Sequence, residues 1–219
     1  MTPRLSVVVP AYQEEAYIAR TLEALRAATP IQVVVVANGC TDGTAAVARA
    51  HGAHVVETPV ANVSRARNIG ARASAGAVLV FLDADTRPAY GALDAIADAV
   101  PDRADYGTCR IRPDGHTPRA VVATTLLAWS HRLAGTSLGV LFCTRALFER
   151  SDGFDERLVA GEDNDLNARF RRLGARRICL GRASAFTSMR RFERLGYVRT
   201  NVAWLRGWFH PPSTYEAVR

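Results

Sequence analysis

The 219-residue sequence contains no lysine, so all 28 residues in its lysine and arginine total are arginines. A Schiff-base enzyme needs a lysine amine, and a P-loop needs a lysine on the phosphates, so this absence excludes both classes. The planar guanidinium group of arginine can donate hydrogen bonds to two oxygens of one phosphate group. With a net charge of +7, the chain is expected to favour anionic partners: nucleotide phosphates, anionic lipid head groups or nucleic acid.

Cysteines and long apolar runs are also scarce. No CxxC pair occurs among the four cysteines, which excludes a typical zinc site and favours reduced thiols in the cytoplasm. No run of 18 uncharged apolar residues exists, because His131 and Arg132 interrupt the nearest candidate, residues 120–143. Pro10 ends the first apolar run too early for a signal peptide. We therefore expect a cytoplasmic protein without a transmembrane segment.

The first 90 residues alternate between short apolar runs and segments with helical periodicity. Continuous apolar strands that alternate with helices are typical of a parallel sheet covered on both faces, so the predicted fold class is α/β. Ser64 is the predicted N-cap of the third helix. The expected strands are residues 5–9, 31–36, 53–57 and 77–82, and the expected helices are residues 14–28, 41–51 and 64–74.

The second half is less regular, and no linker or internal repeat divides the chain, which predicts a single domain over residues 1–219. A last helix should begin near Met189, because apolar residues recur from there at spacings of three and four. The other expected elements are strands at 104–111, 139–144 and 176–180 and helices at 118–134 and 164–173.

Polar residues follow the predicted parallel strands, at the edge of the sheet where ligands bind in such folds. They are Tyr12, Glu14, Asn38, Asp42, Asp83 and Asp85. Asp83 and Asp85 directly follow the fourth strand, and their carboxylates are suited to a hard divalent cation shared with phosphate oxygens. Taken alone, the pair also fits a turn with solvated aspartates.

Four ordered blocks extend this pattern: residues 7–15, Ala37-Asn38-Gly39-Cys40-Thr41-Asp42-Gly43-Thr44, Arg65-Ala66-Arg67-Asn68-Ile69-Gly70 and Gly161-Glu162-Asp163. In them the chain resembles the family 2 glycosyltransferases, whose fold is the GT-A nucleotide-sugar domain. The resemblance covers almost the whole chain. It implies a mostly parallel twisted sheet with helices on both faces, a nucleotide-binding half at 1–90 and an acceptor-side half at 91–219.

The resemblance implies a donor site for a sugar linked to a nucleoside diphosphate of the UDP or GDP type. Asp85 is expected to coordinate Mg²⁺ or Mn²⁺, and Asp83 to contact the ribose or the metal shell. Asn38 stands where the family usually has an aspartate that accepts from the base, and its amide offers an acceptor and a donor. This departure leaves the preferred nucleotide undecided. The other residues expected at the nucleotide are Pro10, Ala11, Tyr12, Glu14 and Arg67.

Residues 161–165, Gly-Glu-Asp-Asn-Asp, are the second candidate constellation. By resemblance, Asp163 is the general base that deprotonates the acceptor hydroxyl, in a direct displacement that inverts the anomeric centre. Glu162 would position the acceptor or orient the base, and the sequence allows the two roles to be exchanged. The alternative is a helix N-terminus where acidic residues interact with the helix dipole.

The last helix carries the remaining candidates. Arg190 and Arg191 are expected at the donor diphosphate, with a solvated basic face as the alternative. His210 is a candidate third metal ligand, as histidine is in some relatives of the family. The alternative is a structural role for this histidine. A contact with a membrane surface is a weaker expectation for the aromatic residues near the C-terminus, Trp204, Trp208 and Phe209 with Arg206.

Two other functions compete with that of a glycosyltransferase. A nucleotidyltransferase also pairs aspartates with a cation, but it would need an early glycine-rich phosphate loop, which residues 9–13 lack. A non-catalytic nucleotide-sugar-binding relative is disfavoured by the presence of Asp83, Asp85 and Asp163. No nucleic acid partner is expected, and no motif identifies the acceptor or the oligomeric state.

Overall fold

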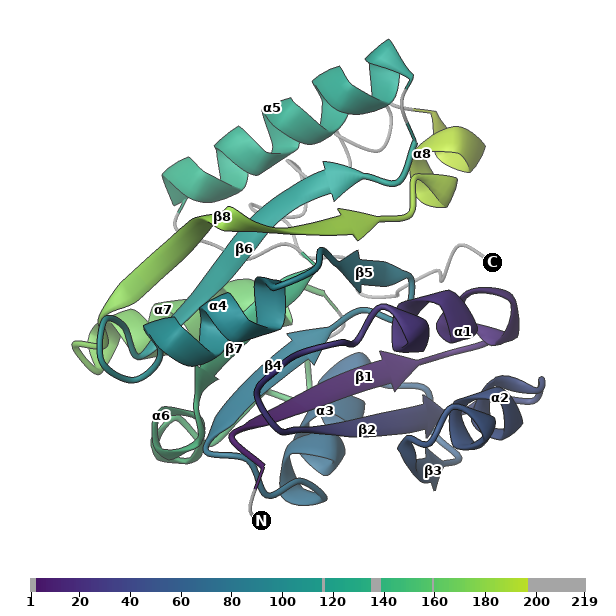
Figure 1. Ribbon diagram of the computed structural model, residues 1–219, viewed down its shortest axis with the longest axis horizontal. Coiled ribbons are helices and arrows are strands. Elements are labelled where there is room, and N and C mark those ends of the chain that lie inside the picture. The colour runs from purple at the N-terminus through teal and green to yellow at the C-terminus, as the bar shows by residue number, and fades with distance from the viewer. Residues whose placement is uncertain (1–2, 116, 135–138, 159, 197–219) are drawn as a thin grey trace.

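The computed structural model describes the chain except residues 1–2, 116, 135–138, 159 and 197–219. Within the described residues, the strands form one eight-stranded sheet in the order β3-β2-β1-β4-β7-β6-β8-β5 (Figure 1). The strands are β1 (Leu5–Ala11), β2 (Ile31–Asn38), β3 (His54–Thr58), β4 (Val78–Leu82), β5 (Thr86–Pro88), β6 (Tyr106–Pro113), β7 (Val140–Thr144) and β8 (Arg177–Thr187).

The first four strands are parallel, as the alternating apolar runs predict. Strand β1 lies between β2 and β4, with Val7 opposite Val33 on one side and Val80 on the other. All seven residues of β1 are buried, which is expected of a central strand covered on both faces. The parallel α/β fold predicted for the first half is therefore confirmed.

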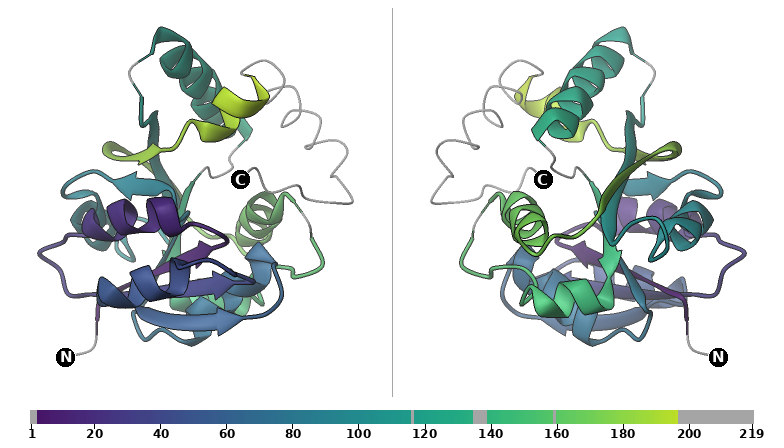
Figure 2. Two further views of the ribbon diagram at one scale, coloured as in Figure 1. Left: turned by 90° about the vertical axis from the view of Figure 1, so that its right-hand side faces the viewer. Right: turned by 90° about the vertical axis from the view of Figure 1, so that its left-hand side faces the viewer.

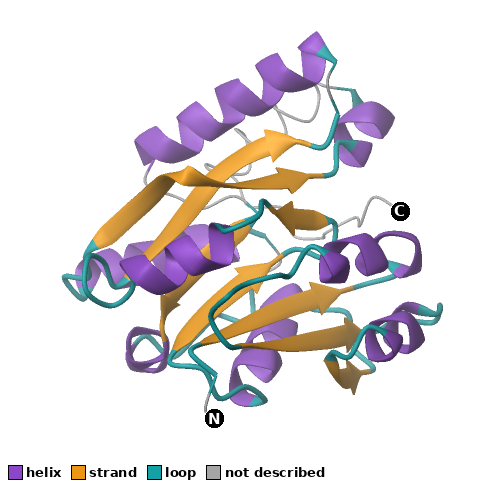
Figure 3. Cartoon of the chain, in the orientation of Figure 1, coloured by secondary structure: helices purple, strands orange, loops and turns teal. Residues whose placement is uncertain are grey.

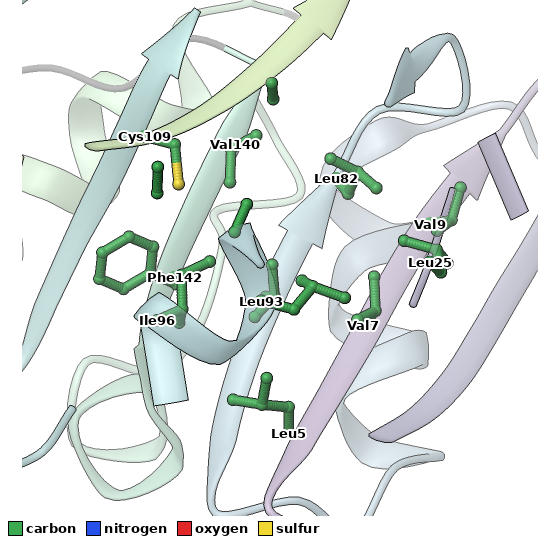
Figure 4. Close-up of a cluster of buried hydrophobic side chains, with 14 of the residues drawn as sticks. Leu5, Val7, Val9, Leu25, Leu82, Leu93, Ile96, Cys109, Val140 and Phe142 are labelled. Atoms are coloured by element: carbon green, nitrogen blue, oxygen red, sulfur yellow. The ribbon is translucent and has the colours of Figure 1, made fainter. Parts of the chain in front are cut away.

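Helices cover both faces of this sheet (Figure 3). Val7 and Val9 of β1 share a core with α1, α2 and α4, while Val8 points to the opposite core with α3, α6 and α7, because successive strand side chains alternate (Figure 4). The helices are α1 (Glu15–Glu23), α2 (Thr44–Ala50), α3 (Val63–Arg72), α4 (Ala92–Ala99), α5 (Pro118–Ala134), α6 (Arg145–Arg150), α7 (Glu162–Arg172) and α8 (Arg190–Leu195).

The second half of the sheet is mixed, in agreement with its less regular sequence. Strand β7 is antiparallel to β4 and β6, and β6 is parallel to β8, which in turn pairs antiparallel with β5. Strand β8 extends to Thr187, beyond the expected 176–180, because it resumes pairing with β6 after an irregularity between Cys109 and Arg110. The sequence reading missed β5, α4 and α6.

One local prediction is wrong. Asn62, not Ser64, is the N-cap of α3: its extended backbone lets its Oδ1 accept the backbone N–H of Arg65 at 2.8 Å. Ser64 lies inside the first turn and is buried.

Helices α5 and α8 lie together at the outer edge of the molecule (Figure 2). Ala120 and Ala123 of α5 pack against Met189 and Phe192, which brings the start of α8 beside α5. Helix α8 begins where the sequence predicts a last helix, and the rest of the predicted apolar stripe falls outside the described residues. No helix in the described part of the chain is long and apolar enough to cross a bilayer. All four cysteines are free, and a cytoplasmic location stays a prediction.

Gly70 allows α3 to pack closely on the sheet. A Cβ at this position would lie 2.3 Å from Cγ1 of Val8, a β-branched side chain with little freedom to move. We expect Gly70→Ala to lower the free energy of unfolding by about 1–2 kcal/mol, because overpacking outweighs the better helix propensity of alanine. Urea denaturation measures this change. Gly181→Ala is the matched control, since no atom lies within 4 Å of the added Cβ, and equal stability of the two variants would contradict the prediction.

Candidate active site

Strands β1, β2 and β4 end at one edge of the sheet, and most of the predicted polar residues lie there. Pro10 and Ala11 are the buried last residues of β1, and Tyr12 and Glu14 follow in the loop to α1. Asn38 ends β2, and Asp83 and Asp85 flank the turn between β4 and β5. These polar residues thus lie together at the carboxyl ends of the parallel strands, as expected.

Arg67 of α3 connects the two acidic motifs. Its Nη1 donates to Glu162 Oε1 at 2.8 Å and to Asp163 Oδ1 at 3.1 Å, and its Nη2 donates to Asp83 Oδ1 at 3.1 Å. Arg67 thus binds Asp83 together with two carboxylates that lie 95 and 96 positions further along the chain than Arg67. Glu162 and Asp163 begin α7, where the helix dipole also favours acidic side chains, as the alternative interpretation of this motif predicts. The role of Asp163 as a base stays a prediction.

The Arg67 guanidinium is almost completely buried, with a side-chain exposure of 7%, and it lies over the Phe154 ring at 5.1 Å from the centroid. Burial by itself lowers the pKa of Arg67, but the nearby carboxylates of Asp163, Glu162 and Asp83 outweigh it and raise the pKa. Burial raises the pKa of Asp163. The charge of Arg67 lowers this pKa, and the charges of Glu162 and Asp83 raise it. A raised pKa moves a carboxylate toward the range in which it can accept a proton during catalysis.

Arg190 is the second shared cation. It pairs with Glu14 and lies 3.3 Å from Oδ2 of Asp85, and its guanidinium lies over the Tyr17 ring at 4.5 Å. The pKa of Asp85 is raised to about 7, chiefly by burial and also by the charges of Asp83 and Glu14, while Arg190 acts to lower it. Glu14 Oε2 is buried without a hydrogen-bond partner.

This site carries more negative than positive charge. Within the described residues, five carboxylates share the guanidiniums of Arg67 and Arg190; they belong to Glu14, Asp83, Asp85, Glu162 and Asp163. The excess, together with the unpartnered Glu14 oxygen, suits a hard divalent cation with oxygen ligands. No group of three or more histidine, cysteine, aspartate or glutamate side chains in the described part is arranged to hold an ion. Asp83 and Asp85 are the residues that could hold such an ion here, and this role stays a prediction.

The loops that follow β1 and β2 are hydrogen-bonded to each other. Gln13, at a φ of 56°, accepts the Thr41 backbone N–H at 2.7 Å and donates to the Thr41 hydroxyl at 2.8 Å. The Asp42 carboxylate accepts backbone N–H groups of Glu15 and Thr44, at 3.3 and 3.1 Å. Asp42 thus supports the loop that carries Glu14. The sequence pattern placed Asp42 among the polar residues at the binding edge and did not distinguish this structural role from ligand binding.

Asn38 is buried, and its Oδ1 accepts the backbone N–H of Asn62 at 2.9 Å. Its Nδ2 makes no hydrogen bond within the described residues. The oxygen, which was the expected acceptor for the base, is therefore already used by the start of α3, although a carbonyl oxygen can accept a second bond. Contact between Asn38 and a nucleotide base stays a prediction.

Asn68 is a residue whose role the sequence reading missed. Its side chain exchanges hydrogen bonds with the backbone of Phe154, donating at 2.9 Å and accepting at 2.9 Å, and so holds the segment that leads to α7. Gly153 lies against the same amide, where an added Cβ would be 2.7 Å from Asn68 Oδ1. Asn68 directly follows Arg67 in the third sequence block, so that block was the available signal.

The side chains of two predicted site residues are not among the described ones. The side chain of Arg191 and the whole of His210 lie outside the described residues, and so do Trp204, Arg206, Trp208 and Phe209. Their expected contacts with the diphosphate, a metal or a membrane remain predictions.

The sequence matches a family model over residues 6–147, described as Glycosyl transferase family 2. An uncharacterized glycosyltransferase of Mycobacterium tuberculosis is 35% identical over 133 residues, which make up 58% of this chain and 59% of that protein. Glycosyltransferase AglE of Haloferax volcanii is 35% identical over 96 residues, 39% of this chain and 32% of the relative. The chain thus spans less than two thirds of the length of these relatives.

Solved structures share the fold at low sequence identity. A TarS fragment of S. aureus in complex with UDP-GlcNAc has a TM-score of 0.69 at 21% identity, over 86% of this chain and 58% of that chain. Mannosyltransferase PcManGT from Pyrobaculum calidifontis in complex with GDP-Man and Mn²⁺ has a TM-score of 0.69 at 23% identity, over 94% and 65%. These similarities confirm the GT-A fold.

Proposed function

Because its match to the family model covers most of the described chain, the protein belongs to glycosyl transferase family 2, and we propose that it transfers a sugar from a nucleoside-diphosphate sugar to an acceptor hydroxyl. One observation carries the proposal: Arg67 joins Asp83, from the Asp83 and Asp85 motif, to Glu162 and Asp163 at the carboxyl edge of the sheet. Sugar transfer needs one acidic group for the cation on the donor diphosphate and another for the acceptor hydroxyl. The two groups must lie close together.

The donor is proposed to be of the UDP or GDP type, with Mg²⁺ or Mn²⁺ as the cofactor. Structures that share the fold contain UDP-GlcNAc, or GDP-Man with Mn²⁺. In this chain Asp85 and Asp83 would hold the cation, which neutralises charge on the leaving diphosphate when bound. Pro10, Ala11, Tyr12 and Asn38 lie at the ends of β1 and β2, beside the position proposed for the nucleotide.

Arg190 is proposed to contact the donor diphosphate. Glu14 and Asp85 hold its guanidinium at the carboxylates proposed for the cation. Its guanidinium would bind phosphate oxygens there through charge-assisted hydrogen bonds, beside the carboxylate of Asp85 that would hold a cation.

Asp163 is proposed as the general base and Glu162 as the residue that positions the acceptor. The Asp163 carboxylate has a raised pKa and a side-chain exposure of 23%, so it combines basicity with access for an acceptor. Arg67 fixes its orientation, and the Asp163 backbone oxygen accepts Asn167 Nδ2 at 2.7 Å. Deprotonation of the acceptor opposite the leaving diphosphate would invert the anomeric centre.

Asp85→Ala tests the donor site. We expect calorimetry to detect Mn²⁺-dependent binding of UDP or GDP by the wild type and a loss of about tenfold or more for the variant, since a cation bridging carboxylate and diphosphate loses a charged ligand. Asp98→Ala, which removes an exposed carboxylate on α4, is the control and should bind as the wild type does. Unchanged Mn²⁺-dependent affinity of Asp85→Ala would remove Asp85 from the metal site.

A screen of UDP- and GDP-sugars for slow hydrolysis would identify the donor without knowledge of the acceptor. Release of the nucleoside diphosphate from one sugar would support a transferase. Binding without release from any of them would favour a non-catalytic nucleotide-sugar-binding relative.

A further inference from the structure

Thr21 lies inside helix α1, but its hydroxyl donates a hydrogen bond to a different part of the chain. A threonine within a helix commonly donates to a backbone oxygen of the preceding turn. Thr21 Oγ1 donates instead to the backbone oxygen of Ala84 at 2.7 Å, across 63 positions of sequence. Both residues are buried, with exposures of 1% and 4%. Because a hydroxyl has a single proton to donate, the whole donor capacity of this side chain is used on Ala84.

Ala84 is the middle residue of the turn that carries Asp83 and Asp85. This turn joins β4 to β5, and α1 lies beside β5 (Figure 1). Its two outer residues are also held by distant segments: the Asp83 N–H donates to a backbone oxygen just before β7 at 3.3 Å, and the Asp85 backbone oxygen accepts an N–H just after β8 at 3.2 Å. Of these three contacts, that of Thr21 is made by a side chain, so a substitution can remove it.

The turn needs such contacts because its two carboxylates repel each other. The negative charges of Asp83 and Asp85 interact, and a turn without outside contacts would favour conformations that move them apart. A divalent cation that both carboxylates hold requires them close together. Thr21 is suited to oppose the repulsion, since a buried β-branched side chain has little rotational freedom and its hydroxyl stays directed at Ala84.

The same side of α1 contacts the arginine at Asp85. Glu14, Tyr17 and Thr21 follow one another at spacings of three and four residues, which places them on one side of the helix. Glu14 pairs with Arg190, and the Arg190 guanidinium lies over the Tyr17 ring. One side of α1 therefore supports both the acidic turn and the cation beside it.

We propose that Thr21 is a positioning residue of the donor site, whose hydroxyl holds the Ala84 carbonyl so that Asp83 and Asp85 stay close enough to share a divalent cation. The inference rests on the proposed function and adds to it a residue outside the four sequence blocks. With an exposure of 1%, Thr21 acts through the turn and does not touch the ligand. Loss of a hydrogen bond that orients metal ligands typically weakens metal binding about 10- to 100-fold.

Thr21→Val tests the proposal, since valine keeps the branched shape of threonine and lacks its hydroxyl. Calorimetry of the full chain with UDP and GDP is carried out in Mn²⁺ and again in EDTA. We expect the Mn²⁺-dependent affinity to fall about tenfold and the affinity in EDTA to stay unchanged. Thr21→Ser keeps the hydroxyl and should bind as the wild type does, although the lost methyl group should lower its melting temperature.

Thr124→Val is the matched control. Thr124 is also a buried helical threonine, 2% exposed, and its hydroxyl donates at the same distance of 2.7 Å, but to Ala120 in its own helix. This variant should keep the wild-type affinity in Mn²⁺. Wild-type affinity of Thr21→Val, equal weakening by Thr124→Val, or a Thr21→Ser variant as weak as Thr21→Val would each overturn the role of Thr21 alone. A wild type without Mn²⁺-dependent binding of either nucleotide would overturn the proposed donor site and the role of Thr21 together.

Discussion

Asp163→Asn is expected to abolish turnover while nucleotide binding stays near the wild-type level. A general base contributes about 10²- to 10⁴-fold to the rate, and the amide cannot accept the proton of the acceptor hydroxyl. The amide oxygen can still accept Arg67 Nη1, which now lies 3.1 Å from Asp163 Oδ1, so the geometry around Asp83 should be retained. Release of the nucleoside diphosphate from the donor sugar measures turnover, and calorimetry measures binding.

Asp165→Asn is a control from the same helical turn. Its carboxylate pairs with Arg169 at 2.7 Å and makes no contact with Arg67, so its turnover should remain within a few-fold of the wild type. Glu162→Gln completes the comparison, because the residue whose amide variant loses more turnover is the base. Turnover by Asp163→Asn above about one tenth of the wild-type rate would assign the base to another residue.

Arg67→Met is expected to have the largest effect on stability. It leaves Asp83, Glu162 and Asp163 together without their shared cation, and an uncompensated buried charge costs about 3–5 kcal/mol. Methionine retains much of the side-chain packing on Phe154, so the loss should come mainly from electrostatics. Urea unfolding in the absence of nucleotide and metal measures the change.

Two further variants identify the cause of that loss. Arg65→Met, also on α3, removes an exposed arginine and should change stability by less than about 0.5 kcal/mol. Combining Arg67→Met with Asp163→Asn removes one of the stranded charges, so the double variant should be more stable than Arg67→Met alone. A double variant that is less stable than Arg67→Met would mean that packing, not charge, is the main contribution of Arg67.

Local sequence patterns predicted much of the first half of the molecule. The apolar strands and the polar residues after them located Glu14, Asn38, Asp83 and Asp85 at one edge, since strand periodicity and the parallel arrangement are local and general properties. The N-cap of α3 was misjudged, because Asn62 and Ser64 are both good capping residues and only backbone geometry separates them. Strand β5, with three residues, and helix α6, with six, were too short for a periodic signal, whereas α4, with eight residues, is longer than the correctly predicted α2.

The chemistry of the candidate residues was determined by the sequence itself: no lysine, paired aspartates after an apolar strand, and an acidic motif at the start of a helix. Their partners were decided only by the tertiary structure, because contacts across nearly one hundred residues depend on how helices pack on the sheet. Arg67 joins Asp83 to Glu162 and Asp163, and Arg190 joins Glu14 to Asp85. The exposure of Val122 and Leu126 on α5 likewise follows from packing, since an apolar sequence does not say which of its side chains the protein covers.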